Sequence, residues 1–213
     1  MKNINYADNM GFNIHASLTD HNFQQKLVAL RTLETQMTRQ NVTWAVYSSA
    51  AMFLLGITPD FNDWDLITIP NDIETTFSIF ANLNATKYEP PAEKSRYFDP
   101  PCRTYSLRNT NFDVSKEFTI TTFGTEYIYK LNKEDIEYID VEWFQIPICP
   151  AEAMFIIYYM MTGWQPNREI KVRWLHDYLE NNLRHPNILQ DALAQNIPYW
   201  IKAEVKELLA NNQ

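Results

Sequence analysis

The stretch Trp44–Ile69, WAVYSSAAMFLLGITPDFNDWDLITI, predicts the fold of the chain. Residues 42–47 form an apolar run typical of a buried strand, and residues 49–55 are apolar enough for a short helix that opens at two serines. Gly56 supplies a stop for that helix, and a turn then leads to a second strand, Asp63–Ile69. The stretch therefore predicts a strand, a helix, a turn and a second strand in one packed core.

Two aspartates at the start of the second strand carry the chemistry of this stretch. Asp63 and Asp65 are two residues apart, and side chains along a strand alternate between its faces. Both carboxylates therefore project the same way, whereas Trp64 and Leu66 point into the opposite layer. Two convergent carboxylates beside the N-terminus of a helix can bind Mg²⁺ together with a phosphate group.

The composition bounds the class of protein. The chain has 213 residues, enough for one large or two small domains, and 46% of them are hydrophobic, so it can bury a substantial core. The formal net charge is −8, which argues against broad binding to nucleic acid because such binding depends on a basic surface. A long nucleic acid is therefore not expected as a partner, while a local basic pocket for a nucleotide is compatible with this charge.

The sequence shows no sign of secretion, membrane insertion or a disulfide framework. The first residues lack an apolar signal segment, and the longest apolar run, Ile148–Trp164, contains Glu152 and is too short to cross a bilayer. The two cysteines, Cys102 and Cys149, lie far apart and form no zinc-binding pair. We expect a cytoplasmic protein that is soluble and does not bind membranes.

Helices are predicted on both sides of the opening stretch. A helix over Asp20–Gln40 begins at Thr19 or Asp20 as N-cap, and Asn71 with Glu74 resembles a capping box that opens a further helix. The apolar residues of the first helix recur at helical spacing at Phe23, Leu27, Leu30, Leu33 and Met37, and those of the further helix at Ile73, Phe77 and Phe80. This order of helices and strands is typical of an α/β domain.

More strands follow a proline-rich segment, Glu89–Pro101, which is predicted to be a loop. The next two strands are Arg103–Leu107 and Phe112–Phe118. Asp113 stands between two apolar residues of the second of these, so it faces away from the layer against which they pack. Further, more exposed strands are predicted over Glu126–Leu131 and Glu137–Ile148.

From Pro150 onward the chain is predicted to be helical. The segment Ala151–Met161 is apolar nearly all round, as a buried helix should be, and Arg168–Asn182 is amphipathic. One side of the amphipathic helix holds Ile170, Trp174, Leu175 and Tyr178, and shorter helices are predicted at about 187–195 and 198–210. The sequence thus predicts an α/β domain over residues 1–149, with a mixed sheet flanked by helices, and a helical C-terminal part over residues 150–213 packed on it.

The order of these parts resembles the nucleotidyltransferase superfold, the family of DNA polymerase beta and of the aminoglycoside, lincosamide and minimal nucleotidyltransferases. Its signature is an apolar residue, Gly, then Gly or Ser, a short gap, and Asp-apolar-Asp/Glu-apolar. Tyr47-Ser48-Ser49 is followed here by residues 50–62 and then by Asp63-Trp64-Asp65-Leu66. The sequence departs from the signature at Ser48, where the family usually has Gly.

The resemblance implies roles for the residues of the signature. Asp63 and Asp65 would bind the metal ion, and Asp113 would complete the site as a further metal ligand or as a general base. Ser48 and Ser49 would contact phosphate.

The C-terminal part is also similar to the layout of the family. The segment Ile146–Glu152 resembles the step from a strand into a buried helix that contains Glu, and Arg168–Arg173 resembles the basic helix that follows. This resemblance implies triphosphate contacts from Arg168 and Lys171, which are three residues apart and share a helix face. Glu152 is expected to cap or pair structurally.

The resemblance implies an enzyme, a nucleotidyltransferase that moves a nucleoside monophosphate from an NTP to a small-molecule or protein acceptor. Its cofactors would be Mg²⁺ and the NTP, with ATP as the expected nucleotide. One alternative is a catalytically silent module of the same fold that binds a partner protein, which the departure at Ser48 motivates. Another is an α/β domain whose aspartates are incidental. The absence of a Gly-rich phosphate loop excludes P-loop kinases and Rossmann dinucleotide enzymes, and the histidines show no metal-ligand spacing.

Overall fold

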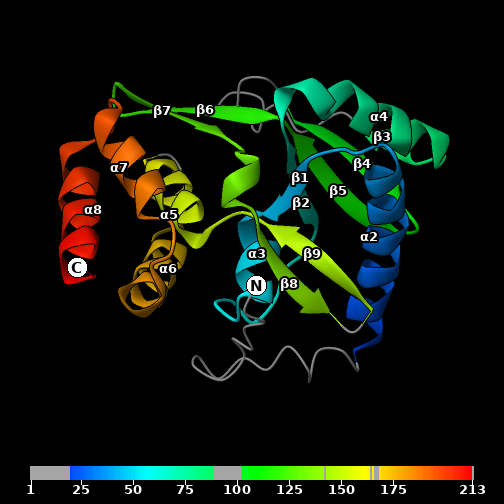
Figure 1. The fold of residues 1–213 in the computed structure, drawn as a ribbon, viewed down its shortest axis with the longest axis horizontal. Helices are drawn as coiled ribbons and strands as arrows, with labels where there is room; N and C mark the ends of the chain where they lie inside the picture. The colour runs from blue at the N-terminus through cyan, green and yellow to red at the C-terminus, as the bar shows by residue number, and fades with distance from the viewer. Residues whose placement is uncertain (1–19, 89–101, 142, 164, 166–167, 213) are drawn as a thin grey trace.

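The computed structural model describes residues 20–88, 102–141, 143–163, 165 and 168–212 (Figure 1). The predicted loop Glu89–Pro101 lies outside the described residues, as do residues 1–19. The helices are α2 (His21–Arg39), α3 (Ser48–Leu54), α4 (Ile73–Asn82), α5 (Ala151–Met161), α6 (Glu169–Asn182), α7 (Pro186–Ala194) and α8 (Tyr199–Asn211). The strands are β1 (Trp44–Tyr47), β2 (Trp64–Thr68), β3 (Thr86–Tyr88), β4 (Arg103–Leu107), β5 (Thr110–Ser115), β6 (Glu117–Thr122), β7 (Thr125–Lys130), β8 (Glu137–Val141) and β9 (Phe144–Ile148). Short 3₁₀ helices are η1 (Pro70–Asp72) and η3 (Lys133–Asp135).

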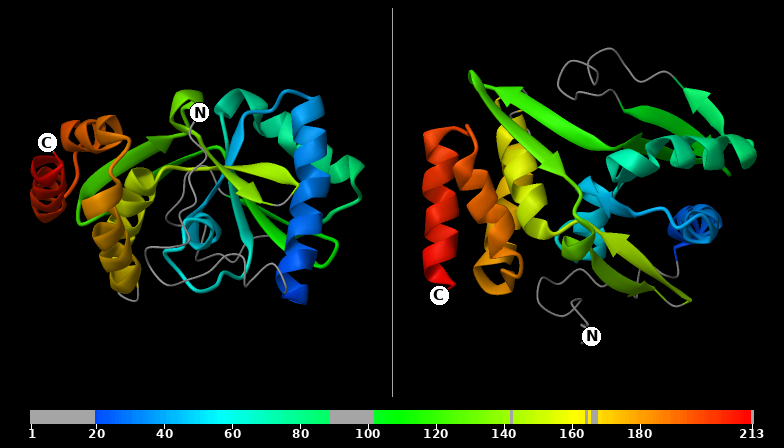
Figure 2. Two further views of the ribbon diagram at one scale, coloured as in Figure 1. Left: turned by 60° about the horizontal axis from the view of Figure 1, so that its bottom comes forward. Right: turned by 45° about the horizontal axis from the view of Figure 1, so that its top comes forward.

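Seven strands form one mixed sheet in the order β3-β4-β5-β2-β1-β9-β8. The central strand β2 runs parallel to β5 and antiparallel to β1, and β1 runs parallel to β9. Figures 1 and 2 show α2 and α4 on one side of this sheet, while α5 to α8 gather on the other. The predicted mixed sheet with flanking helices and a helical C-terminal part is therefore confirmed.

The two faces of the sheet have different neighbours. Trp64 of β2 is fully buried and donates its indole N–H to a carbonyl oxygen of α2 at 3.1 Å. Phe112 of β5, which pairs with Trp64 in the parallel register, meets the ring of Phe80 in α4 at 5.6 Å between centroids. Trp64 and Phe112 therefore lie on the face covered by α2 and α4. Because side chains alternate along a strand, Asp65 and Asp113 lie on the opposite face.

The ends of the early helices follow the sequence signals. The Asp20 carboxylate accepts hydrogen bonds from the backbone N–H groups of Asn22 and Phe23, so Asp20 is the N-cap of α2. Gly56 follows α3 with φ +74°, a conformation that costs glycine little, and ends this helix as predicted. The residues predicted on the buried face of α2 are all buried: Phe23, Leu27, Leu30, Leu33 and Met37.

The predicted capping box at Asn71 and Glu74 is wrong. Pro70–Asp72 forms the 3₁₀ helix η1, and α4 begins at Ile73 without a side-chain hydrogen bond at its cap. The fixed φ of a proline suits the first position of such a short turn. The carboxylate of Asp72 accepts a hydrogen bond from the backbone N–H of Thr43 at 2.7 Å, so the acid at this turn holds the segment before β1 instead.

Two of the predicted strands are each two strands in the structure. The predicted strand Phe112–Phe118 divides because β5 ends at Ser115 and β6 forms a separate two-stranded sheet with β7. The predicted strand Glu137–Ile148 is the hairpin β8–β9, and β9 is mostly buried in the main sheet beside β1 rather than exposed. An apolar pattern identifies an extended segment but not the partner that it will pair with, which tertiary packing decides.

The C-terminal helices pack as predicted, with one exception. Helix α5 is buried nearly all round, but Ile170 of α6 is 41% exposed, so its predicted place on the buried side is wrong. The buried face of α6 runs through Val172, Leu175 and Leu179, at spacings of three and four residues that leave Ile170 off this face. The division after residue 149 stays a prediction. No helix within the described residues is long and apolar enough to cross a membrane.

Candidate active site

Adjacent strands bring two of the predicted aspartates side by side. In the parallel register of β2 and β5, Asp65 pairs with Asp113, and in the antiparallel register of β1 and β2, Tyr47 pairs with Asp65. These three residues therefore stand in one row across three strands, on the sheet face away from α2 and α4. Asp65 and Asp113 are close to each other, as predicted, because β5 pairs with β2 in this register.

The sequence predicts Asp63 as the first residue of this strand, but β2 begins one residue later, at Trp64, and Asp63 lines the same cavity as Asp65. Lys26 of α2 fixes this segment, because its ammonium group donates to the carbonyl oxygen of Phe61 at 2.6 Å and lies 4.2 Å from the Phe61 ring centroid. Burial lowers the pKa of Lys26, and the nearby carboxylates of Asp63, Asp20 and Asp60 oppose that shift. Lys26 of α2 therefore holds the residues that lead into Asp63.

Hydrogen bonds orient the side chains of Asp113 and Tyr47, the two neighbours of Asp65 on the adjacent strands. The Thr104 hydroxyl of β4 donates to a carboxylate oxygen of Asp113 at 2.6 Å, and Asp113 is only 3% exposed. Ser115 follows Asp113 by two residues in β5, so it lies on the same face, and its hydroxyl donates to the Tyr47 hydroxyl oxygen at 3.4 Å. Burial raises the pKa of Tyr47, and the charge of Asp65 adds to this shift, so the phenol stays protonated. Asp113 is therefore held in a fixed orientation toward the cavity.

Ser48, which stands where the signature has glycine, adopts a backbone conformation that favours glycine. Its φ is +65°, in the left-handed region that a side chain disfavours, and α3 begins at this residue. The backbone at Ser48 therefore carries some conformational strain. Ser48 and Ser49 both line the cavity that holds the aspartates.

The basic residues reach the cavity from the C-terminal part. Arg168 and Lys171, at the start of α6, both line it, on the same side as Tyr158 of α5. The ammonium group of Lys171 donates to the Tyr158 hydroxyl oxygen at 3.3 Å, and the Tyr158 hydroxyl lies 2.8 Å from the hydroxyl oxygen of Ser48. Burial, together with the charge of Arg168, lowers the pKa of Lys171 to about 8. Two positive groups and three aspartates therefore line the same cavity.

All seven site residues that the sequence predicts line this one cavity of about 220 Å³. They are Asp63, Asp65, Asp113, Ser48, Ser49, Arg168 and Lys171. The three aspartates thus lie at one cavity, and the alternative in which they point apart does not hold. Further lining residues that the sequence did not indicate are Tyr47, Tyr158 and Gln165, and an apolar wall comes from Met154, Ile157 and Met161. Tyr158 in particular looks like a core residue by pattern, because α5 is apolar nearly all round.

The donor atoms of the site suit a magnesium ion. Mg²⁺ is bound by oxygen ligands, commonly one or two carboxylates together with substrate phosphates and water. Asp63, Asp65 and Asp113 offer carboxylate oxygens at one cavity, and the positive groups of α6 face them. The three aspartates do not close around a single point as a cage would. This open arrangement fits an ion that is shared with a nucleotide.

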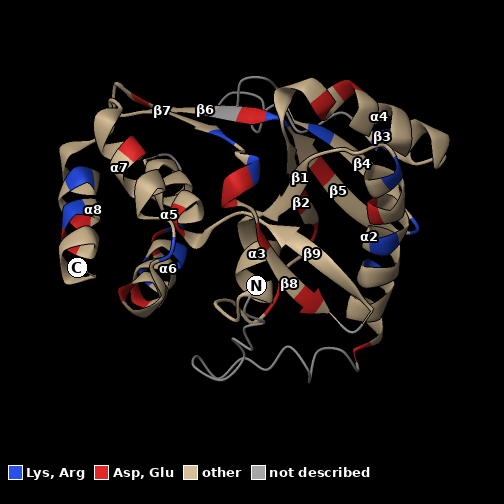
Figure 3. Cartoon of the chain, in the orientation of Figure 1, with Lys and Arg blue, Asp and Glu red and all other residues tan. Residues whose placement is uncertain are grey.

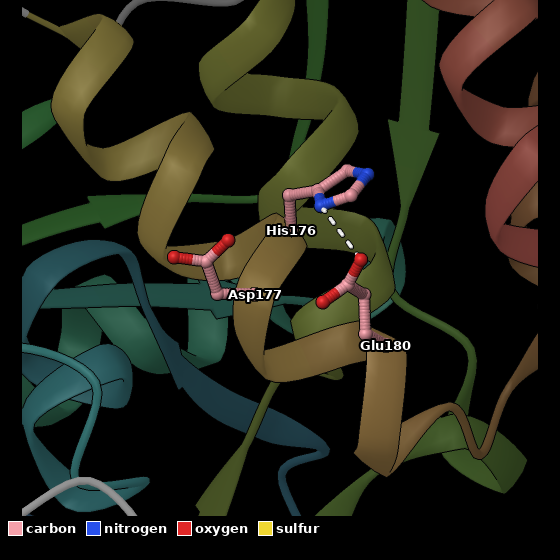
Figure 4. A group of neighbouring side chains, drawn as sticks. All are labelled: His176, Asp177 and Glu180. Atoms are coloured by element: carbon pink, nitrogen blue, oxygen red, sulfur yellow. Dashed lines mark ion pairs between the residues drawn. The ribbon is translucent and has the colours of Figure 1, made fainter.

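A second group of acidic residues with a histidine lies on α6, outside this cavity. The potential ligand atoms of His176, Asp177 and Glu180 are all within 4.8 Å of one another, the one such triplet among the residues that the structure describes. All three belong to a single helix, and the His176 to Glu180 contact of 3.9 Å in Figure 4 is an ordinary pair four residues apart. Asp177 and Glu180 are exposed. We assign no site to this group.

Glu152 has the structural role that the sequence predicts. Its carboxylate is buried in the first turn of α5 and accepts hydrogen bonds from the backbone N–H groups of Arg184 at 2.7 Å and His185 at 2.8 Å. Burial raises the pKa of Glu152, while these backbone hydrogen bonds oppose the shift. Glu152 therefore holds the link between α6 and α7 and takes no part in the cavity.

No family model and no curated protein sequence matches this chain. Solved structures do match it in fold. The antibiotic-resistance factor ANT(2'')-Ia in complex with adenylyl-2''-tobramycin has a TM-score of 0.54 at 11% identity, covering 90% of this chain and 99% of that one. The solution structure of ANT(2'')-Ia has a TM-score of 0.53 at 13% identity, covering 73% and 85%.

A protein of Thermotoga maritima assigned to the nucleotidyltransferases matches similarly. Its TM-score is 0.52 at 17% identity, over 73% of this chain and 93% of that chain. Together with the row of aspartates, the serine turn and the basic helix, these likenesses confirm the resemblance at the level of fold. The chain has the nucleotidyltransferase fold.

Proposed function

We propose that this protein is a Mg²⁺-dependent nucleotidyltransferase that moves a nucleoside monophosphate from an NTP, with ATP as the expected nucleotide, to a small-molecule or protein acceptor. The single observation that carries the proposal is the pairing of Asp65 with Asp113 on adjacent strands, in a cavity that also holds Ser48, Ser49 and the basic residues of α6. Carboxylates, hydroxyl groups and cations are the groups that bind and activate a nucleoside triphosphate.

Each side of the cavity has a distinct task in this proposal. Asp63 and Asp65 would hold the ion, which, when bound, neutralises charge on the transferred phosphoryl group. Arg168 and Lys171 place positive charge where the triphosphate would lie, and they stabilise the negative charge that moves onto the leaving pyrophosphate. The hydroxyl groups of Ser48 and Ser49 donate hydrogen bonds to phosphate oxygens.

Asp113 is placed to act on the acceptor. Its carboxylate faces the cavity and is oriented by the Thr104 hydroxyl, so it can take the proton from an acceptor hydroxyl as the acceptor oxygen attacks the α-phosphorus. If Asp113 instead held a second ion, the carboxylate would supply a ligand to it, and the ion, when bound, would lower the pKa of the acceptor hydroxyl. In either role, the residue acts in the chemical step rather than in nucleotide binding.

The acceptor is proposed to be a small molecule or a protein rather than a long nucleic acid. Acidic and basic positions are interspersed along α2, α6 and α8 in Figure 3, and the chain carries a net charge of −8. A long polyanion binds best to a continuous basic surface. The apolar wall of Met154, Ile157 and Met161 offers a surface for a base or for an acceptor of modest size.

The test is a thermal unfolding scan with nucleotide. We expect Mg²⁺ plus ATP or GTP to raise the midpoint of unfolding, because a ligand present at about one hundred times its Kd stabilises the folded state by about 2.7 kcal/mol. ATP without Mg²⁺ should give a smaller shift. The absence of a shift with every NTP in the presence of Mg²⁺ would instead favour the silent module that binds a partner protein.

A further inference from the structure

The Tyr158 hydroxyl stands between the two halves of the candidate active site. Tyr158 is 2% exposed, and among the described residues its hydroxyl group has two hydrogen-bond partners, Ser48 of the turn before α3 and Lys171 of α6. Ser48 belongs to the α/β part, and Lys171 belongs to the C-terminal part. A single buried oxygen atom thus connects the turn that would contact phosphate with the helix that would neutralise it.

The direction of the hydrogen bonds follows from the chemistry of the three groups. An ammonium group only donates, so Lys171 uses a lone pair of the phenol oxygen as its acceptor. A buried hydroxyl proton needs an acceptor of its own, and the Ser48 oxygen at 2.8 Å is the one available to Tyr158. Ser48 therefore accepts from Tyr158, and its own proton is left to donate into the cavity. This arrangement orients the Ser48 hydroxyl toward a phosphate oxygen.

The Tyr158 ring adds to the same connection. The Lys171 nitrogen lies 5.0 Å from the ring centroid, and the guanidinium carbon of Arg168 lies 5.5 Å from it. Both cations are within the range of a cation–π attraction. The ring supports the position of the two cations, whereas the hydroxyl supplies the connection to Ser48. The two contributions can therefore be separated by a change that removes only the oxygen atom.

We propose that Tyr158 is a positioning residue whose hydroxyl couples Ser48 to Lys171, so that the serine turn and the basic helix bind the triphosphate as one unit. This inference rests on the proposed function, because it assigns the two coupled groups to the triphosphate. It also explains the serine at a position with φ +65°. Glycine would fit this backbone without strain but would leave the buried Tyr158 proton without an acceptor.

The test uses Tyr158→Phe and Ser48→Gly, alone and together, with Tyr159→Phe as the matched control. Tyr159 is the next residue of α5 and does not line the cavity. We expect the Kd for Mg²⁺-ATP, or the KM for ATP, to rise about tenfold in each variant, with kcat changing less, because one hydrogen bond to the ligand or to a charged group is lost. The double variant should bind ATP no more weakly than Tyr158→Phe alone, and Tyr159→Phe should have the Kd and KM of the wild type.

Ser48→Gly separates a positioning role from a structural one. Glycine relieves the left-handed strain, whereas the buried Tyr158 proton loses its acceptor, so these two effects oppose each other in the midpoint of thermal unfolding, and the deciding result is weaker ATP binding. A serine that merely fills the glycine position predicts the opposite for binding, with ATP held equally well or more tightly. That result, or full additivity of the two changes, would overturn the coupling.

A second measurement needs no nucleotide. The rate of reductive methylation of the Lys171 amine, read by peptide mass spectrometry, should rise about fivefold in Tyr158→Phe and rise also in Ser48→Gly. Lys202, whose ammonium donates to the carbonyl oxygen of Leu193 at 2.9 Å, is the internal reference and should keep its rate. An unchanged Lys171 rate in both variants refutes the coupling. A raised rate in a protein that binds no NTP supports the coupling and refutes the proposed nucleotide site.

Discussion

Two clusters of charged residues lie between the α/β part and the C-terminal helices, and they are built in opposite ways. In the candidate active site, Asp63, Asp65 and Asp113 line one cavity together with Arg168 and Lys171. In the second cluster, which we call the Glu152 link, the charged and polar groups bind one another directly. The contrast is between charged groups that line a cavity, which a ligand can enter, and charged groups that bind one another within the fold.

The Glu152 link joins β8 and η3 to the segment between α6 and α7. Arg184 forms an ion pair with Glu137 at 3.1 Å, and His185 lies 3.4 Å from Glu137 and 3.6 Å from Asp135. Glu152 accepts from the backbone N–H groups of Arg184 and His185. Its buried carboxylate thus has partners within the protein, and no ligand is needed to satisfy it.

The largest expected effect is a loss of activity on substitution of an aspartate in the candidate active site. Asp63→Asn should lower nucleotidyl transfer by roughly 10³-fold, because several kcal/mol of charge stabilisation in the transition state are lost with the carboxylate. Asp63 is only partly buried, so the midpoint of thermal unfolding should change little. The measurement is transfer from labelled ATP, with Asp177→Asn on the exposed face of α6 as the control. A fully active Asp63→Asn enzyme would remove the basis for the proposed metal ligand.

The next effect, in the Glu152 link, concerns stability. Glu152→Ala should lower the free energy of unfolding by about 1–3 kcal/mol, because the partly buried hydrogen bonds from the N–H groups of Arg184 and His185 lose their acceptor. Glu152→Gln keeps an acceptor oxygen of the same length and should cost clearly less. Urea unfolding at neutral pH measures both, and the Kd for ATP should stay the same in Glu152→Gln. Equal loss in the two variants would mean that the charge, and not the hydrogen bonds, stabilises the link.

The sequence predicts the candidate site better than it predicts the Glu152 link. The period of two along a strand places Asp63 and Asp65 together. Asp113 lies on the face opposite to its apolar neighbours, and it shares the face of Asp65 once β5 pairs with β2. The role of Glu152 could be expected because a charge in an apolar helix needs a partner. The identity of that partner could not, because the two N–H groups lie 32 and 33 residues further along the chain.

The failures of sequence analysis have a common physical cause. The change of sheet after Ser115, the buried place of β9 and the exposed side of Ile170 all depend on which elements meet in space. Tyr158 shows the same limit at the active site. Its helix is apolar on all sides, so no periodicity distinguishes a tyrosine of the core from one whose hydroxyl reaches a cavity.

The smallest expected effect is a dependence of stability on pH in the Glu152 link. The hydrogen bond with Glu137 raises the pKa of His185 above its ordinary value of 6.5, and the charges of Glu152 and Asp135 add to this shift, while burial opposes it. The folded protein then binds the His185 proton more tightly than the unfolded chain does. The stability that this proton contributes is complete below about pH 6.5 and is lost as the pH rises through the folded pKa.

The measurement compares thermal unfolding between pH 5.5 and 8.5 in the wild type, in His185→Gln and in Glu137→Gln. Wild-type stability should fall across this range more steeply than in either variant, since each variant removes one member of the pair that holds the proton. His176 pairs with Glu180 and Glu204 at distances of 3.9 Å and 3.5 Å, so His176→Gln is the matched control for a histidine near carboxylates. A slope unchanged in His185→Gln but lost in His176→Gln would locate the proton on α6 rather than in the Glu152 link. The pH dependence would then not distinguish the Glu152 link from the candidate active site.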